Sequence, residues 1–405
     1  MKQGWEIKKL GEVSIVFEDG DWIESKDQSI EGVRLIQTGN IGSGFFKDRG
    51  EKARYISEDT FKRLRCTEIF EDDCLISRLP DPVGRACVLP NTGEKMITAV
   101  DCTIIRFDKN KLMSEWFLLY SLSQEYQNEV NKQVSGATRQ RISRKNLGLI
   151  EIPLPPLPEQ QRIVAILDEA FAAIAKAKAN AQQNLKNAKE LFDGYLHKYY
   201  TSKEDGWEEK KLKEVADYFN GLTYSPKDVS DEGIIVLRSS NVQKDELDFK
   251  DIVRVNLTVK EKIIVKDGDI LMCSRNGSAR LVGKTARIKD LAEEMTFGTF
   301  MMIIRSEYNP YLSWFFKSTD FRNQIKGGEN TMINQITRYM LDDIVISFPP
   351  IDKQQTIVQK LDTLNAETKK LESIYQQKIN DLEELKKSVL QKAFSGELKT
   401  VRGEV

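Results

Sequence analysis

The sequence predicts an α+β fold: two mixed α/β domains in tandem repeat, joined by two long helices that form an antiparallel coiled coil. Three observations lead to this prediction. The chain repeats its own motifs in order, each repeat contains short β-rich runs separated by turn residues, and each repeat ends in a long amphipathic helix. The predicted parts are the globular domains 1–153 and 204–348 and the helical segments 154–203 and 349–405.

The clearest sign of duplication is a proline-to-helix junction that occurs twice. It is PPLPEQQRIVAIL at residues 155–167 and PPIDKQQTIVQKL at residues 349–361. Other phrases recur around it in the same order, such as WEIKKLGEV at 5–13 and WEEKKLKEV at 207–215. Because a chance motif would not keep its neighbours in order, we interpret the chain as an internal duplication.

Length and composition limit the class of protein. A chain of 405 residues is long enough for two or three domains with cores of their own, and its net charge of −1 gives no overall basicity. Five cysteines without a C-x-x-C pair, and a single histidine, predict buried free thiols rather than a zinc site. No stretch is apolar enough to span a membrane, and the N-terminus lacks a signal segment, so we expect a cytoplasmic protein with no membrane association.

The globular parts are predicted to be built from short strands. The β-rich runs are RLIQTGNI, CLISRL and CTIIRF in the first repeat, and IIVLRSS, DILMCSR and MMIIRS in the second. One amphipathic helix is expected after these strands, near residues 114–133 in the first repeat and 313–325 in the second. No long helix separates each strand from the next, which argues against a doubly wound parallel sheet.

The two long helices should each span about 40 residues, or roughly 60 Å. Pro158 suits the first position of the first helix, and Asp352 with Gln355 suits a capping box at the start of the second. Spacings of three and four place one apolar seam on each helix. The predicted seam residues are Ile163, Leu167, Ala170, Ile174, Ala177, Ala181, Asn184, Ala188, Leu191 and Tyr195, and then Leu361, Leu364, Thr368, Leu371, Tyr375, Lys378, Leu382, Leu385 and Val389. The alternative is that each helix lies along its own domain.

This arrangement resembles the specificity (S) subunit of Type I restriction-modification enzymes. The resemblance covers essentially the whole chain and rests on a variable domain, a P-L-P-P-L-x-E-Q-x-x-I-type junction and a long helix, all of which occur twice. The phrases GDILMCSRNGSARLVGKTARI and SGATRQRISRKNL are also similar to those of the family. The second junction departs from the pattern, with Asp352-Lys353 where the first has Pro158-Glu159.

The resemblance implies a non-catalytic subunit that recognises double-stranded DNA. Each globular part would be a target-recognition domain for one half of a bipartite site, and the helices would set the spacing and dock two modification (methyltransferase) subunits. Restriction/translocase subunits would complete the assembly. S-adenosylmethionine, ATP and Mg would then be bound by those partner subunits, and no cofactor is expected in this chain.

The motifs that catalysis would need are missing from the sequence. Both Pro-Pro pairs follow an apolar residue, Leu154 or Phe348, and not the Asp or Asn of an adenine methyltransferase motif. The phrase V-G-K-T at 282–285 lacks the upstream glycine of a P-loop and is expected to be a turn before a strand. We therefore predict no catalytic residue and no metal site.

Three segments carry side chains suited to DNA, because arginine can pair with guanine, and glutamine or asparagine with adenine. The basic segment 135–147 contributes Arg139, Gln140, Arg141, Arg144 and Lys145. Its counterpart in the second repeat contributes Asn330, Asn334, Gln335 and Arg338. The ends of two predicted strands contribute Arg78, Ser274, Arg275 and Asn276. The alternatives are a solvated helix start for the basic segment and structural salt bridges for Arg78 and Arg275.

A second functional hypothesis is a structural adaptor, with two similar protein- or peptide-binding domains held apart by a coiled-coil rod. The two hypotheses differ in their response to salt. Because nucleic-acid binding releases counterions, the affinity of a DNA-binding subunit should fall steeply as salt is added.

Overall fold

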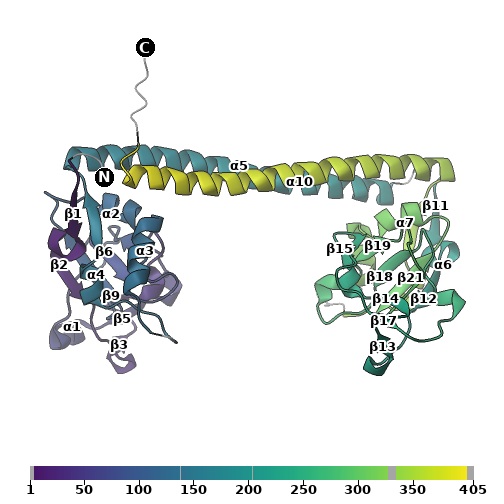
Figure 1. Ribbon diagram of the computed structural model, residues 1–405, viewed down its shortest axis with the longest axis horizontal. Helices are drawn as coiled ribbons and strands as arrows, with labels where there is room; N and C mark the ends of the chain where they lie inside the picture. The colour runs from purple at the N-terminus through teal and green to yellow at the C-terminus, as the bar shows by residue number, and fades with distance from the viewer. Residues whose placement is uncertain (1–3, 137, 203, 327–333, 399–405) are drawn as a thin grey trace, which may run out of the picture. The chain divides into compact units, whose positions relative to one another are not determined.

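The computed structural model describes residues 4–136, 138–202, 204–326 and 334–398. It divides into two compact units: unit 1 comprises Met1–Ala181 and Gln377–Val405, and unit 2 comprises Gln182–Gln376. Each unit contains one globular domain, called domain 1 and domain 2 below. Each unit also contains part of both long helices, α5 (Leu157–Thr201) and α10 (Ile351–Phe394), which are labelled in Figure 1.

Domain 1 is built on two four-stranded sheets. The first has the order β2–β9–β6–β7 and is antiparallel, and the second has the order β3–β5–β4–β8, in which β4 and β8 are parallel. A short pair, β1 with β10, leads into α5. The strands are β1 (Glu6–Lys9), β2 (Ser14–Asp19), β3 (Gln28–Ser29), β4 (Val33–Ile36), β5 (Arg54–Ile56), β6 (Cys74–Ser77), β7 (Ala86–Val88), β8 (Met96–Thr98), β9 (Cys102–Phe107) and β10 (Glu151–Leu154).

Domain 2 repeats this topology and adds one short antiparallel pair, β15 with β16. Its sheets have the orders β12–β21–β18–β19 and β13–β17–β14–β20, β14 and β20 are again the parallel pair, and β11 pairs with β22. The strands are β11 (Glu208–Lys211), β12 (Asp217–Asn220), β13 (Val229–Ser230), β14 (Ile234–Leu237), β15 (Val242–Gln243), β16 (Glu246–Leu247), β17 (Arg254–Val255), β18 (Ile270–Cys273), β19 (Thr285–Arg287), β20 (Met295–Phe297), β21 (Met301–Arg305) and β22 (Val345–Phe348). The α+β class and the duplication are confirmed, and each of the six predicted strand runs contains a strand.

The region expected to form one helix in each domain forms two. Domain 1 has α2 (Ser114–Ser121) and α3 (Gln124–Gln133), and domain 2 has α7 (Asn309–Phe315) and α8 (Thr319–Lys326). The prediction of a single helix was wrong because a serine ends the first helix and begins the second. The hydroxyl of Ser123 accepts a hydrogen bond from the backbone N–H of Tyr126 (3.2 Å), and Ser318 does the same for Phe321 (3.2 Å). The remaining short helices are α1 (Glu58–Leu64), α4 (Arg144–Gly148), α6 (Leu212–Val215) and α9 (Arg338–Asp342).

The repeated junction attaches each long helix to its domain through one buried glutamine. The side-chain amide nitrogen of Gln160 donates to the carbonyl oxygens of Pro155 and Lys111 (both 2.8 Å), and its carbonyl oxygen accepts from the N–H of Met113 (2.9 Å). In the second junction, Gln354 donates to Pro349 (2.8 Å). The junction is therefore repeated because the same joint is built twice.

The starts of the helices differ by one residue from the prediction. Because α5 begins at Leu157 and α10 at Ile351, Pro158 is the second helical residue and Asp352 lies inside the first turn. The predicted capping box of Asp352 and Gln355 was therefore wrong.

Replacing Gln160 with alanine should lower the free energy of unfolding by about 2 kcal/mol, because it leaves buried backbone groups of the joint without partners. The matched control is Gln161→Ala, since Gln161 is the exposed neighbour in the same turn. Urea unfolding followed by tryptophan fluorescence would measure both changes. Equal effects of the two substitutions would mean that the joint does not depend on this hydrogen-bond network.

The contacts within each unit are those of antiparallel helices. In unit 1, Ile163 near the start of α5 shares a hydrophobic core with Leu390 near the end of α10, and Lys178 forms an ion pair with Glu383. In unit 2, the end of α5 and the start of α10 share a core, which includes Leu196 and Leu361. The antiparallel pairing is confirmed. The first turns of each helix also pack on its own domain, whereas the last turns pack on the other domain. The alternative interpretation therefore describes only the helix starts.

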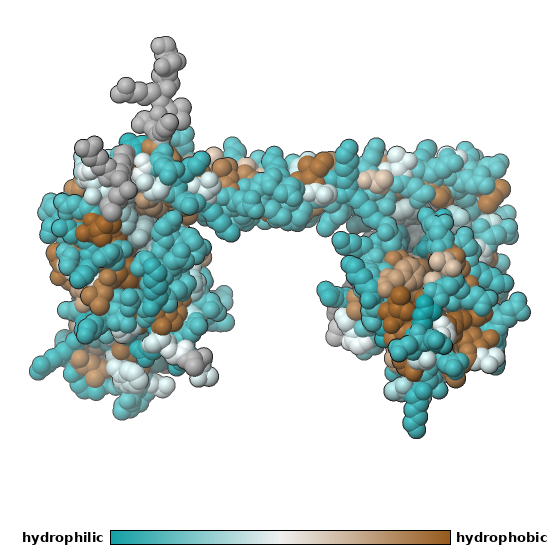
Figure 2. All heavy atoms as spheres, in the orientation of Figure 1, coloured by the Kyte–Doolittle hydropathy of each residue, from teal (hydrophilic) through white to brown (hydrophobic). Residues whose placement is uncertain are grey.

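The apolar seams were predicted with too strict a heptad repeat. The buried positions on the last turns of α5 include Leu196 and Tyr200, which lie outside the predicted seam, because a straight helix drifts relative to a 3.5-residue repeat and because these turns pack on domain 2. Figure 2 shows hydrophobic side chains exposed along the two helices. The predicted seam residues that are exposed are Asn184, Leu191, Tyr195, Leu371, Lys378 and Leu385. No helix in the described part of the chain carries an apolar stretch that would span a bilayer.

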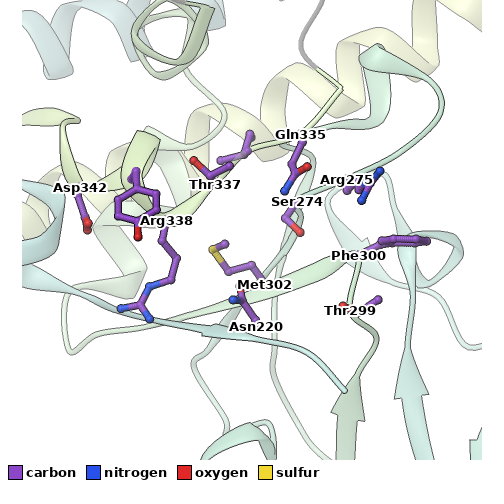
Figure 3. A pocket seen from close by; sticks show the side chains of 12 residues that line it. Asn220, Ser274, Arg275, Thr299, Phe300, Met302, Gln335, Thr337, Arg338 and Asp342 are labelled. Carbon is purple, nitrogen blue, oxygen red and sulfur yellow. The ribbon is translucent and has the colours of Figure 1, made fainter. Parts of the chain in front are cut away.

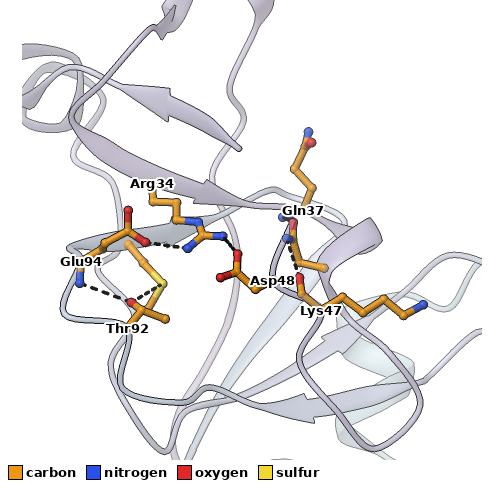
Figure 4. A network of polar contacts seen from close by, with 8 residues as sticks. Arg34, Gln37, Lys47, Asp48, Thr92 and Glu94 are labelled. Atoms are coloured by element: carbon orange, nitrogen blue, oxygen red, sulfur yellow. Dashed lines mark hydrogen bonds and ion pairs between the residues drawn. The ribbon is translucent and has the colours of Figure 1, made fainter. Parts of the chain in front are cut away.

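Polar residues of the repeated strand-to-turn phrases hold the turns together. The buried Arg34 on β4 binds Asp48 and Glu94, and its guanidinium lies between their two carboxylates in Figure 4. The side chain of Asn40 accepts from the N–H of Gln37 (3.0 Å) and donates to the carbonyl oxygen of Lys47 (3.0 Å). These side chains form their hydrogen bonds and ion pairs within the domain, so few of their polar groups could bind a ligand.

All five cysteines are free and buried, as predicted. Burial raises the pKa of Cys87 to about 12 and that of Cys102 to about 12. These thiols therefore stay protonated at neutral pH and behave as small apolar side chains.

Candidate DNA interface

In domain 2, two segments chosen for their chemistry lie side by side. The chain leaves β18 at Ser274, and the segment before α9 runs next to it. The N–H of Ile336 donates to the carbonyl oxygen of Ser274 (2.7 Å), and Arg275 and Gln335 form an antiparallel bridge. The strand end and the loop, although far apart in the sequence, therefore form one surface.

This surface encloses an open cavity of about 650 Å³. Four of the predicted site residues line it: Ser274, Arg275, Gln335 and Arg338. Figure 3 shows Arg275 and Phe300 together on one side of the cavity and Arg338 on the other, with Ser274 and Gln335 between them. The guanidinium of Arg275 lies 5.6 Å from the centre of the Phe300 ring, a cation–π contact that holds the arginine at the rim.

The two predicted asparagines of domain 2 lie beside the cavity. The side chain of Asn276 donates to the hydroxyl of Ser239 (3.2 Å), and its backbone N–H donates to the carbonyl oxygen of Asn334 (3.4 Å). Asn276 therefore ties its loop to the neighbouring turn, while Asn334 is exposed. Asn330 lies outside the described residues.

Domain 1 has the same arrangement. The N–H of Ile142 donates to the carbonyl oxygen of Arg78 (3.2 Å), so the basic segment runs beside the end of β6. Ser143 then caps α4, because its hydroxyl accepts from the N–H of Asn146 (3.1 Å). The cap aims the first turn of α4, which contains Arg144 and Lys145, at the same surface as the strand end.

Arg78 is the predicted site residue that the structure places inside the domain. It is 4% exposed, its guanidinium donates to the carbonyl oxygen of Val100, and its Nε lies 3.4 Å from a carboxylate oxygen of Asp19. This position corrects the sequence-based prediction of a DNA contact and agrees with the salt-bridge alternative.

The other predicted residues of domain 1 are on the surface. The guanidinium of Arg141 lies 3.6 Å from the carboxylate of Asp101, and that of Arg144 lies 3.7 Å from Asp19. Both are loose ion pairs that another acceptor could replace. The exposed set is Arg139, Gln140, Arg141, Arg144 and Lys145.

Sequence reasoning missed the residues that face these side chains. They are Asp19 and Asp101 in domain 1, and Asn220 and Phe300 in domain 2. The signal was present, because Asp101 and Phe300 immediately precede the repeated strands CTIIRF and MMIIRS. Only the strand pairing shows that these residues lie at the edge of the sheet that meets the segment before the short helix.

The V-G-K-T phrase has a structural role. The ammonium of Lys284 donates to the carbonyl oxygens of Ser239 and Val242 (2.7 Å for the latter), and β19 starts at the next residue. In domain 1, Arg85 binds the carbonyl oxygens of Thr38 and Ile41 (both 2.8 Å). The expectation of a turn before a strand is confirmed. Desolvation lowers the pKa of Lys284.

Comparison with known proteins places the chain in a family. The sequence profile of the Type I restriction modification DNA specificity domain matches twice, over residues 2–187 and 204–384. The Type I restriction enzyme EcoKI specificity subunit of Escherichia coli strain K12 is 28% identical over 98% of this chain and 90% of its own length.

Two solved structures have the same fold. A chain from a structure of complex assembly and conformational transition in the type I restriction-modification system has a TM-score of 0.80 at 18% identity, covering 98% of this chain and 99% of that one. The HsdS subunit from Thermoanaerobacter tengcongensis has a TM-score of 0.63 at 18% identity, with 98% of both chains covered.

The two profile matches together span most of the chain, and these findings do not favour the adaptor hypothesis. Specificity subunits of type I systems recognise DNA, assemble with other subunits and are themselves non-catalytic. The chain belongs to the type I restriction-modification DNA specificity family, as a specificity subunit with two DNA specificity domains.

Proposed function

We propose that each domain recognises one half of a bipartite, asymmetric DNA sequence with the surface formed by its strand end and the segment before its short helix. One observation carries the proposal: in both domains the polar segment before the short helix runs beside the end of the same strand, and in domain 2 that strand end adds Arg275 to the surface. Exposed arginines such as Arg144 and Arg338 are suited to phosphate oxygens, and Gln335 is suited to base edges.

The two long helices would set the spacing between the half-sites and dock two modification (methyltransferase) subunits. Exposed apolar side chains on both helices support this part of the proposal, because such side chains on a rod mark a surface for partners. They are Leu191, Tyr195, Leu371, Ile374 and Leu385.

The remaining parts of the complex would supply the chemistry. Methylation with S-adenosylmethionine would belong to the modification subunits, and ATP- and Mg-dependent translocation and cleavage to restriction/translocase subunits. This chain would bind no cofactor of its own and would act in the cytoplasm.

Replacing Arg275 and Asn276 with alanine should relax the second half-site and leave the first unchanged. Arg275 offers its guanidinium at the rim of the cavity, and Asn276 holds the loop that presents it. Loss of one good base contact is worth roughly 1–3 kcal/mol. The complex would be purified from its native host, and the methylated adenines in the genome would be mapped for wild type and variant.

The control for this experiment is Arg280→Ala, which removes an exposed arginine of the same domain that does not line the cavity. It should leave both half-sites as they are. Equal relaxation of both half-sites by the double variant, or none, would mean that Arg275 and Asn276 only support the fold.

A further inference from the structure

Hydrogen bonds at the strand ends align the candidate interfaces of the two domains residue by residue. The N–H of Arg78 donates to the carbonyl oxygen of Asp101 (2.9 Å), just as the N–H of Ser274 donates to that of Phe300 (3.0 Å). The registers of the adjoining strands agree with this alignment. The equivalent positions are Asp19 and Asn220, Arg78 and Ser274, Asp101 and Phe300, Thr103 and Met302, Arg141 and Gln335, and Arg144 and Arg338.

The set in domain 1 is dominated by charge. Asp19 lies between two arginines, 3.4 Å from Arg78 and 3.7 Å from Arg144, and Asp101 lies 3.6 Å from Arg141. Arg141 and Arg144 are exposed, while both carboxylates are partly buried. Domain 1 therefore presents arginines that are already oriented by carboxylates.

The same positions in domain 2 are mostly neutral. Asn220, Phe300, Met302 and Gln335 all line the cavity, and Phe300 is 55% exposed. Arg338 is the charged side chain that the two sets have in common, and Arg275 and Asp342, which lie outside these equivalent positions, add one positive and one negative charge to the cavity. The equivalent surfaces therefore have the same backbone but different chemistry.

Side chains of these two kinds recognise different base pairs in the major groove of DNA. Arginine makes a paired contact with guanine and aspartate accepts from the amino group of cytosine, whereas glutamine or asparagine pairs with adenine and an aromatic ring contacts the methyl group of thymine. A loose surface ion pair contributes little to the stability of the domain. Arg141 can therefore leave the carboxylate of Asp101 and bind guanine with only a small loss of free energy.

We infer that, at the base pair that these equivalent positions contact, domain 1 recognises G·C and domain 2 recognises A·T. Two pairs of equivalent positions account for this difference. The loop carries Arg141 in domain 1 and Gln335 in domain 2, and the strand end carries Asp101 in domain 1 and Phe300 in domain 2. The inference rests on the proposed function, in which both surfaces face DNA.

The test exchanges the two deciding positions. The variant Gln335→Arg with Phe300→Asp gives domain 2 the side chains of domain 1. The complex containing this chain would be incubated with a library of random duplexes, and the bound duplexes would be sequenced. We expect the second half-site to gain G·C over A·T at the contacted base pair by roughly 10-fold or more, and the first half-site to be unchanged.

Two controls make the result specific. The reciprocal variant Arg141→Gln with Asp101→Phe should change the first half-site towards A·T and leave the second as it is. Arg280→Gln, outside the cavity, should change neither. Thermal unfolding would confirm that each variant is folded before its selected sequences are compared.

The outcomes separate the inference from the function on which it rests. If wild type selects two distinct half-sites of the same base composition at these positions, or if a folded variant that binds DNA selects unchanged sequences, the inference is overturned and the proposed function stands. If no duplex is enriched by the wild-type complex, both are overturned.

Discussion

A chain that ends after Lys386 is expected to have an unfolded domain 1 and a folded domain 2. The deleted end of α10 supplies Leu390, Ala393 and Phe394 to the core of domain 1. The ring of Phe394 packs edge-on against Trp116, with the ring centres 5.5 Å apart. Burial of these side chains is worth about 5 kcal/mol, which is comparable to the whole stability of a small domain.

Urea unfolding followed by circular dichroism would test this expectation, since loss of one domain should remove one of two transitions. A milder form of the test is Phe394→Ala, which should cost about 3–5 kcal/mol because it leaves a cavity between aromatic rings. The matched control is Leu385→Ala, because Leu385 lies on the same helix and is 48% exposed. If truncation destabilised both domains equally, the assignment of this helix end to domain 1 would be wrong.

Residues 1–203 alone are expected to form a homodimer that recognises an interrupted palindrome of the first half-site. At its own end, α5 carries Tyr200, whose ring centre lies 4.9 Å from that of Tyr311 and 5.3 Å from that of Phe315 in domain 2. In domain 1, Phe394 packs in the same way on Trp116 and Tyr120, with ring centres 5.5 and 5.2 Å apart. The end of α5 from a second copy can therefore take the place that Phe394 has in the full chain, in an isologous interface. Protein symmetry is mirrored in the DNA site.

The homodimer should need the modification subunits to hold it, because the seam of α5 is rich in alanine and Asn184 is exposed. The fragment would be expressed with those subunits, and the methylated sites would be sequenced. Tyr200→Ala in the fragment should abolish methylation of the palindrome. An asymmetric bipartite site, or sites without inverted repeats, would contradict the symmetric arrangement.

Much of the candidate interface could be predicted from residue chemistry, because arginines, glutamines and asparagines clustered in a loop with few or no acids are suited to nucleic acid. Arg141 and Gln335 are examples, and both lie on the surface. Arg78 and Arg275 could not be separated in this way, since each follows an apolar strand. The side chain of Arg78 is buried beside Asp19, which lies on a strand far away in the sequence. The side chain of Arg275 instead packs on Phe300 at the rim of the cavity.

The sequence by itself determined the elements and their order: the duplicated strands, the proline junctions and the two long helices. These elements depend on local periodicity and on turn residues, both of which can be recognised from a few neighbouring positions in the sequence. Only the tertiary structure decided that the end of α10 completes the core of domain 1 and the end of α5 that of domain 2. It also decided that Asp101 faces Arg141, whereas Phe300 at the equivalent position contacts Arg275. Such choices depend on contacts between residues distant in the chain, and a single sequence carries no local signal for them.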